Sequence, residues 1–298
     1  MNHLSTTKRA AIIRCLVEGH SIRSTVRITG AAKNTISKLL LDLGAVCSDY
    51  QDATLRDLPC KRLQFDEIWS FVGVKVANIP DERRGEPGIG DVWTWTAICA
   101  DTKVVPSFLV GDRSLDAAKA FVGDVASRLA GRVQISTDGY TLYLTAIDDA
   151  FGMEVDYAML VKLYGPDGAG NSYPERKYSP GKVNGARKER IQGDSDPAHV
   201  STSYVERQNL TMRMSMRRFT RLTNAFSKKV ENLAAAVALH FLYYNFARPH
   251  TTLTKAAGGT PTTPAMAAGK GDHVWTVEDI ARLLDQPVEP VPWAGQSL

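Results

Sequence analysis

The sequence predicts an α/β protein, in which a sheet of mixed strand direction with flanking helices follows an all-α N-terminal domain. Two observations support this fold class. Residues 4–45 carry apolar side chains at helical spacing, and residues 62–165 contain short apolar runs typical of strands. Helix-like and strand-like segments then alternate, as they do in α/β sheets. With 298 residues, 44% of them hydrophobic and 23% charged, the chain can bury a core, which excludes a wholly disordered protein.

The N-terminal segment is predicted to form three short helices. Gly19 ends the first, Ser21 is a suitable N-cap for the second, and the third runs from Lys33 to Leu43. This order is typical of a helix-turn-helix, in which polar residues near the start of the last helix contact phosphates and base edges. The candidate DNA-binding residues there are Lys33, Asn34, Thr35, Ser37 and Lys38. The alternative is a small helical cap on the next domain. We predict this domain at residues 1–46.

A linker is expected at residues 47–61, followed by a second domain at 62–250. Its expected strands are 63–76, 93–100, 104–110, 132–137 and 155–163, and its expected helices are 115–130, 142–151, 202–219 and 227–246. Residues 164–199 are rich in glycine, proline and charge, and predict an insertion or a loop. The remainder, 251–298, is predicted to be a tail with a turn-rich piece and one short helix at 276–284.

Basic residues concentrate between Glu206 and Glu231, although the formal net charge of the chain is only +4. This stretch contains no acid, and its basic residues are Arg207, Arg213, Arg217, Arg218, Arg221, Lys228 and Lys229. Arg213, Arg217 and Arg221 lie one helical turn apart, so they predict a stripe on one helix. Two interpretations stay open, a solvated helix face or contact with nucleic-acid phosphates. On the second, the candidate DNA-binding residues are Arg207, Arg213, Arg217 and Arg221.

Three acidic residues lie in contexts that indicate chemistry. Asp66 is inside an apolar strand, where a charge is costly unless an arginine or a metal ion pairs with it. Asp138 falls at the carboxyl end of a strand, where α/β sheets place functional groups, and Glu206 begins the basic helix. Each residue alone is more often structural, but together they fit a ribonuclease-H-like two-metal site for phosphoryl transfer. Strand alternation predicts that Glu67 points to the opposite face from Asp66.

The strings that contain these acids resemble the three acidic motifs of bacterial DDE transposases, most closely those of the insertion-sequence-one family. The strings are DEIWSFV at 66–72, TDGY at 137–140 and YVERQNLTMR at 204–213. The likeness continues through residues 226–232 and 243–250, so it covers most of the chain from about 60 to 250. The predicted helix-turn-helix agrees with it.

The resemblance implies a ribonuclease-H-like fold and a DNA transposase that binds the terminal inverted repeats of an insertion sequence. It implies metal-dependent cleavage of DNA strands and their transfer into target DNA. Asp66, Asp138 and Glu206 are then the catalytic and metal-binding residues for two Mg²⁺ ions, which Mn²⁺ can replace. The implied partners are element-end and target DNA, with a homodimer or larger oligomer on DNA. A catalytically silent transposase-derived regulator and a ribonuclease-H-like nuclease without joining activity are the alternatives.

The cysteines and the N-terminal sequence indicate the cellular compartment of the protein. The four cysteines, Cys15, Cys47, Cys60 and Cys99, are far apart and form no CxxC pair. The N-terminus has no apolar run before a small-residue cleavage site. We therefore expect a reduced cytoplasmic protein, associated with the bacterial nucleoid if the resemblance holds. We also expect no structural zinc, although the insertion-sequence-one type often carries a cysteine-rich zinc-binding segment.

Overall fold

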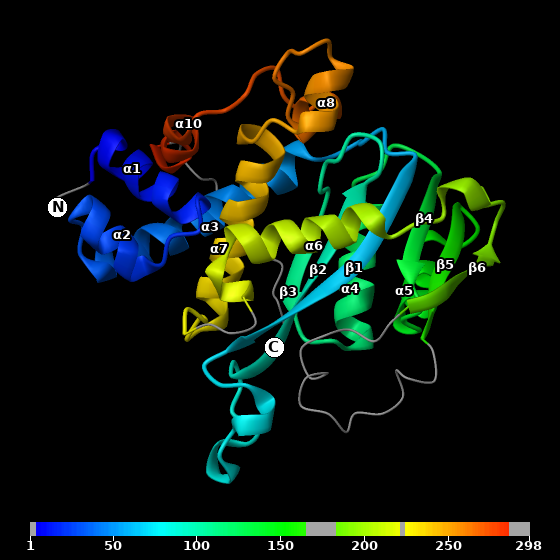
Figure 1. Cartoon of the computed structure of the whole chain (residues 1–298), viewed down its shortest axis with the longest axis horizontal. Coiled ribbons are helices and arrows are strands. Elements are labelled where there is room, and N and C mark those ends of the chain that lie inside the picture. Colours follow the sequence, from blue (N-terminus) through cyan, green and yellow to red (C-terminus); the bar gives the residue numbers. More distant parts are fainter. Residues whose placement is uncertain (1–3, 165–182, 221–223, 286–298) are drawn as a thin grey trace.

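The structure, a computed structural model, describes residues 4–164, 183–220 and 224–285. Its centre is a mixed six-stranded sheet in the order β3-β2-β1-β4-β5-β6 (Figure 1). The strands are β1 (Arg62–Val72), β2 (Gly90–Cys99), β3 (Phe108–Gly111), β4 (Val133–Asp138), β5 (Val155–Tyr164) and β6 (Val183–Gln192). β1, β4 and β5 pair in parallel, whereas the β1–β2, β2–β3 and β5–β6 pairs are antiparallel. The predicted α/β class with a sheet of mixed direction is confirmed.

Helices cover both faces of the sheet. α4 (Leu115–Ala126) and α5 (Leu142–Phe151) lie on one face, where Phe121 and Tyr143 pack against Phe65 of β1. α6 (Ser203–Ser215) and α7 (Val230–Leu242) lie on the other, and Figure 1 shows α6 crossing over β1 and β2. Alternate residues of β1 therefore face different helices, with Phe65 toward α4 and α5 and Ile68 in one apolar cluster with Val205 of α6.

Shorter elements complete the described chain. The expectation of one short helix in the tail is wrong, because the described part of the tail forms α8 (Thr251–Ala256), α9 (Pro264–Ala267) and α10 (Val277–Arg282). The 3₁₀ turns are Val76–Asn78, Asp81–Arg83, Pro197–His199, Arg217–Phe219 and Leu283–Asp285, and a π turn spans Tyr243–Ala247. α10 returns to the N-terminal helices, where Arg9 pairs with Asp285 at 2.8 Å. No helix within the described ranges is long and apolar enough to cross a membrane.

The N-terminal segment contains the three predicted helices, α1 (Thr6–Val17), α2 (Ile22–Thr29) and α3 (Lys33–Thr54). Ser21 caps α2 as expected, since its side chain accepts a hydrogen bond from the Ser24 N–H. α3 is longer than predicted, so the linker expected at 47–61 is wrong over its first half. The reason is tertiary packing, because the buried face of α3 continues through Cys47 and Gln51 against α7.

Part of the segment expected as an insertion or loop is also regular. β6 pairs with β5 at the edge of the sheet, so the expectation for 164–199 is wrong over Val183–Gln192. Residues 165–182 lie outside the described residues. The long helix expected at 202–219 is shorter than predicted, because Met216 adopts an extended conformation and ends α6 at Ser215.

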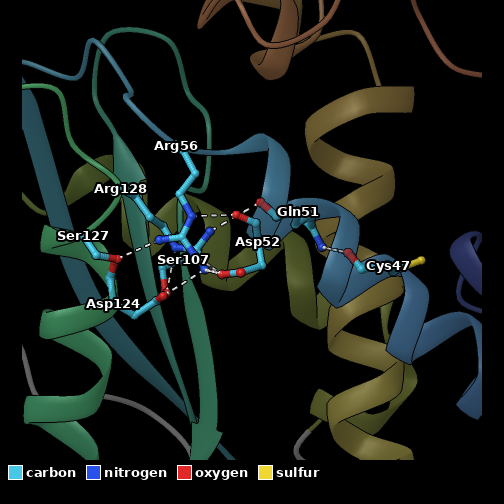
Figure 2. Close-up of polar contacts among 8 residues, drawn as sticks. All are labelled: Cys47, Gln51, Asp52, Arg56, Ser107, Asp124, Ser127 and Arg128. Atoms are coloured by element: carbon cyan, nitrogen blue, oxygen red, sulfur yellow. Dashed lines mark hydrogen bonds and ion pairs between the residues drawn. The ribbon is translucent and has the colours of Figure 1, made fainter. Parts of the chain in front are cut away.

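A polar network joins the C-terminal end of α3 to α4 (Figure 2). The Arg128 guanidinium, whose side chain is 8% exposed, lies 2.7 Å from Asp52 of α3 and 2.8 Å from Asp124 of α4. Arg56 also pairs with Asp52 and donates to Ser127 Oγ at 2.9 Å. The buried Arg128 guanidinium, which lies between these two carboxylates, therefore links α3 to α4.

We expect Arg128→Ala to lower the free energy of unfolding by about 1–3 kcal/mol, because two partly exposed carboxylates lose their shared cation. Urea denaturation measures the change. Arg14→Ala is the control, since Arg14 is 67% exposed and lies 3.6 Å from Glu278, and its loss should cost under about 0.5 kcal/mol. Equal effects of the two substitutions would contradict this role for Arg128.

Candidate active site

Asp66 and Asp138 lie at matching positions on neighbouring parallel strands. β1 and β4 pair Gln64 with Ser136, and a step of two residues along each strand leads to Asp66 and Asp138. Both carboxylates therefore face the side of the sheet that α6 covers. Gln64 fixes the start of that helix, because its Oε1 accepts a hydrogen bond from the Tyr204 N–H at 2.8 Å. The sheet thus places two of the three predicted acids together, and both are half-buried.

Glu206 reaches the same face from the first turn of α6, and its side chain is 43% exposed. Its Oε1 accepts a hydrogen bond from Thr202 Oγ1 at 2.6 Å and lies 2.6 Å from Lys162 Nζ. Lys162 lies on β5, two residues beyond the one that pairs with Asp138. Glu206 is therefore turned toward an ammonium group. Among the residues that the structure describes, no three Asp, Glu, His or Cys side chains converge closely enough to hold a metal ion.

The environment of Asp66 opposes its ionisation. Burial raises its pKa to about 7, and the nearby charges of Glu67, Asp138 and Glu206 raise it as well. The Glu67 N–H, which donates to Asp66 Oδ1 at 2.9 Å, acts in the opposite direction. In the described part of the chain, the hydrogen bonds to Asp66 come from this N–H and from the Asn209 amide, both uncharged. The site therefore concentrates negative charge that a cation would relieve.

The raised pKa of Asp66 predicts that the free energy of unfolding of the metal-free protein depends on pH. Because the pKa is raised on folding, the native state binds more protons than the unfolded chain between about pH 4 and 7, and stability falls as the pH rises through this range. Asp66→Asn removes the ionisable group and with it this loss of stability. We therefore expect the free energy of unfolding of the variant, relative to that of wild type, to increase by on the order of 2 kcal/mol between pH 5 and 8. Urea denaturation in EDTA measures this. Asp148→Asn, at an exposed position of α5, should show no such trend.

Glu67 points to the opposite face, as predicted. Its side chain is 2% exposed, pairs with Arg113 and accepts a hydrogen bond from the Tyr143 hydroxyl at 3.0 Å. The Arg113 guanidinium also lies 3.9 Å from the centre of the Tyr140 ring, and the Tyr140 N–H donates to Asp138 Oδ1 at 2.9 Å. The ion pair of Arg113 with the buried Glu67 carboxylate, on one face of the sheet, thus supports the turn that holds Asp138 on the other face.

Three residues that contact these acids were not predicted from the sequence. Arg113 contacts Glu67 from a loop 46 residues away, and Lys162 contacts Glu206 across 44 residues. Asn209 Nδ2 donates to Asp66 Oδ2 at 2.8 Å across 143 residues. Only Asn209 carries a usable signal, since it follows Glu206 by three residues and therefore lies on the same side of a helix.

A groove of about 1350 Å³ lies between the N-terminal helices and the segment that follows α6. Its basic lining residues are Arg23, Lys33, Arg217, Arg218, Lys228 and Lys229, with Glu18 as the one acid among its lining. Burial lowers the pKa of Arg218 to about 10, and its Nη1 donates to Ser227 Oγ. Because a half-buried guanidinium here is held by a neutral hydroxyl, the groove favours an anionic ligand.

The candidate DNA-binding residues divide between this groove and other surfaces. The groove brings together Lys33, Asn34, Ser37 and Arg217. Those outside its lining are Thr35, Lys38, Arg207 and Arg213. Arg221 lies outside the described residues. The predicted stripe of three arginines on one helix is wrong, because α6 ends at Ser215 and Arg217 belongs to a 3₁₀ turn.

Comparisons with known proteins leave the family open. No family model matches the chain, and no curated protein matches it. Among solved structures, the chain is similar to a piggyBac transposase in a synaptic complex with hairpin DNA, determined by cryo-electron microscopy. The TM-score is 0.41 and the identity 9%, over 94% of this chain and 70% of that one. A likeness at this level assigns no family and no residue role.

Proposed function

We propose that this protein is a DNA transposase of the DDE type, which cuts DNA at the ends of an insertion sequence and joins those ends to target DNA. The observation that carries the proposal is the placement of Asp66 and Asp138 at matching positions of parallel strands, with Glu206 on a helix across the same face. The resemblance of the strings at 66–72, 137–140 and 204–213 to insertion-sequence-one transposases supports the same assignment.

Among the described residues the three acids do not converge on one point, but their donor chemistry suits divalent cations. The donors are carboxylate oxygens, which Mg²⁺ prefers, and one or two carboxylates with water and substrate phosphates commonly suffice to bind it. Asp66 carries a raised pKa amid neighbouring acids, as expected of a site that a cation completes. We propose that Asp66, Asp138 and Glu206 hold two Mg²⁺ ions, which Mn²⁺ can replace. Bound cations would neutralise phosphate charge and stabilise the attacking and leaving oxygens.

The proposed reaction consists of two in-line displacements. Water attacks the phosphodiester at the element end, and the bond to the 3′-oxygen breaks to leave a free 3′-hydroxyl. This hydroxyl then attacks a target phosphodiester, where a new P–O bond forms as an old one breaks. The chain supplies position and charge, with no covalent link to DNA. The sheet fixes Asp66 and Asp138, while Lys162 adds a positive charge beside Glu206 for the DNA backbone.

A joining assay tests the proposal. The substrates are labelled DNA with the inverted repeats that flank the gene and a supercoiled target plasmid. We expect joined products with Mg²⁺ or Mn²⁺ and none in EDTA. Cleavage without joining under all conditions would replace the transposase by a nuclease. Binding of the ends without cleavage under either ion would leave a silent DNA-binding regulator as the better account.

The basic groove is the proposed DNA-binding surface. It combines Lys33, Asn34 and Ser37 at the start of α3 with Arg217 and Lys228 from the segment after α6. Phosphate contacts from both sides would fix the orientation of the DNA, while the polar residues of α3 are of the types that contact base edges. Joining two element ends requires two such surfaces, so we also propose a homodimer or larger oligomer on DNA.

We expect Arg217→Ala with Lys228→Ala to weaken DNA binding about tenfold at moderate salt. Because each lost phosphate contact changes the slope of log K against log salt by about 0.9, the slope should become shallower by about 1.8. Fluorescence anisotropy over a salt series measures both quantities. Lys119→Ala with Lys255→Ala removes the same charge outside the groove lining and serves as the control. An equal change in slope for the two double variants would exclude the groove as the binding surface.

A further inference from the structure

Asn209 lies within the acidic site, although the three acidic motifs do not include it as a functional residue. It follows Glu206 by three residues on α6, so both side chains lie on one side of the helix. It is 8% exposed, whereas the Glu206 side chain is 43% exposed. Its Nδ2 donates to Asp66 Oδ2 at 2.8 Å, which places the amide in direct contact with a predicted catalytic carboxylate.

The other half of the amide is unsatisfied. Asn209 Oδ1 is buried and has no hydrogen-bond partner within the described residues. Because the amide nitrogen faces Asp66 Oδ2, the amide oxygen is directed away from that carboxyl group. Buried polar atoms in folded proteins are nearly always paired, and an exception calls for an explanation such as an ion that binds there.

We propose that Asn209 is a fourth residue of the acidic site, where its amide nitrogen holds Asp66 and its amide oxygen is a ligand of the divalent cation. This inference rests on the proposed function and adds a residue to it. An uncharged oxygen suits the position, because Asp66 and Asp138 already bring two carboxylates to this face of the sheet. Amide oxygens are ordinary ligands of hard divalent cations, so the residue adds a donor to the site without adding charge.

Cation binding by the DNA-free protein tests this role with no reliance on joining activity. Isothermal titration with Mn²⁺ compares wild type with Asn209→Ala, and circular dichroism in EDTA verifies that each variant is folded. We expect Asn209→Ala to bind Mn²⁺ about 10- to 100-fold more weakly. Leu210→Ala, at the next position of α6 with 43% exposure, is the matched control and should bind as wild type does.

Asn209→Asp separates the two roles of the amide. It keeps an oxygen of the same reach but cannot donate to Asp66, so we expect it to recover Mn²⁺ affinity to within about threefold of wild type. Affinity as low as that of Asn209→Ala would overturn the role of the oxygen as a ligand. Wild-type affinity in Asn209→Ala would overturn the inference while leaving the proposed function standing. Failure of wild type itself to bind Mn²⁺ would overturn the proposed cation site and this inference together.

Discussion

Asp66→Asn is expected to reduce strand transfer by ~10³-fold or more, while binding of element-end DNA stays within about threefold of wild type. Asparagine preserves the size of the side chain but removes the negative charge that faces α6 beside Asp138. Joining rates at saturating DNA and binding measured by anisotropy separate the two effects. A folded Asp66→Asn variant that joins DNA at the wild-type rate would exclude Asp66 from the chemistry.

The neighbouring acid is the matched control for this prediction. Glu67→Gln removes a charge on the opposite face of the same strand, where Arg113 and Tyr143 hold it. We expect it to lower the free energy of unfolding by about 1–2 kcal/mol, because the partner guanidinium is 36% exposed, and to leave joining within about tenfold of wild type. Equal loss of joining in folded Glu67→Gln and Asp66→Asn would contradict the assignment of the catalytic face.

Gly44→Ala is expected to destabilise the protein by about 2–4 kcal/mol through overlap at the crossing of α3 and α7. A Cβ at this position would lie within 2.3 Å of the Ala235 Cβ and 2.4 Å of its Cα, so relief requires a shift of the α7 backbone. The two helices hold the N-terminal segment, with the predicted DNA-binding residues, against the body that carries the acids. We therefore also expect a loss of element-end binding that exceeds the unfolded fraction.

Gly123→Ala provides the control at a helical glycine without such a contact. A Cβ there meets nothing within 4 Å, so the substitution gains helix propensity alone. We expect it to stabilise the protein by up to about 1 kcal/mol. Urea denaturation of both variants measures the difference. Similar effects of the two substitutions would contradict a close approach of α3 and α7 at Gly44.

Elements with strong local patterns could be predicted from the sequence. The helix expected at 142–151 coincides with α5, and the strand expected at 155–163 differs from β5 by one residue. Both have apolar spacing of a single period between clear boundaries. The cap at Ser21 is equally local, because a side chain and an N–H three residues later determine it.

Elements that depend on distant partners could not be predicted from the sequence. The extension of α3 through Gln51 rests on burial against α7, nearly 190 residues away, where Gln51 Nε2 donates to Ala238 O at 3.2 Å. β6 could not be predicted for a different reason. Its sequence VNGARKERIQ is mostly polar, because it is an edge strand with largely exposed side chains, and it lacks the apolar alternation that marks a strand.

In the candidate site, too, some features could be predicted from local sequence and others could not. Asp66 and Asp138 could be selected as candidates because each acid stands in or at the end of an apolar strand, a context visible in a few neighbouring residues. The ion pair of Lys162 with Glu206 and the contact of Asn209 with Asp66 join segments 44 and 143 residues apart. Residue type and local spacing do not encode such pairs, so they depend on the folded topology.

The proposed function requires a direct contact between Asp138 and a cation that takes part in joining DNA. Its most direct test is strand transfer by Asp138→Cys and Asp138→Ala in Mg²⁺ and in Mn²⁺. Sulfur is a poor ligand for Mg²⁺ but a better one for Mn²⁺. We expect both variants to be inactive in Mg²⁺, and Mn²⁺ to restore joining to Asp138→Cys alone. Wild-type joining by Asp138→Ala, or equal recovery of both variants in Mn²⁺, would contradict a direct contact between Asp138 and a catalytic cation.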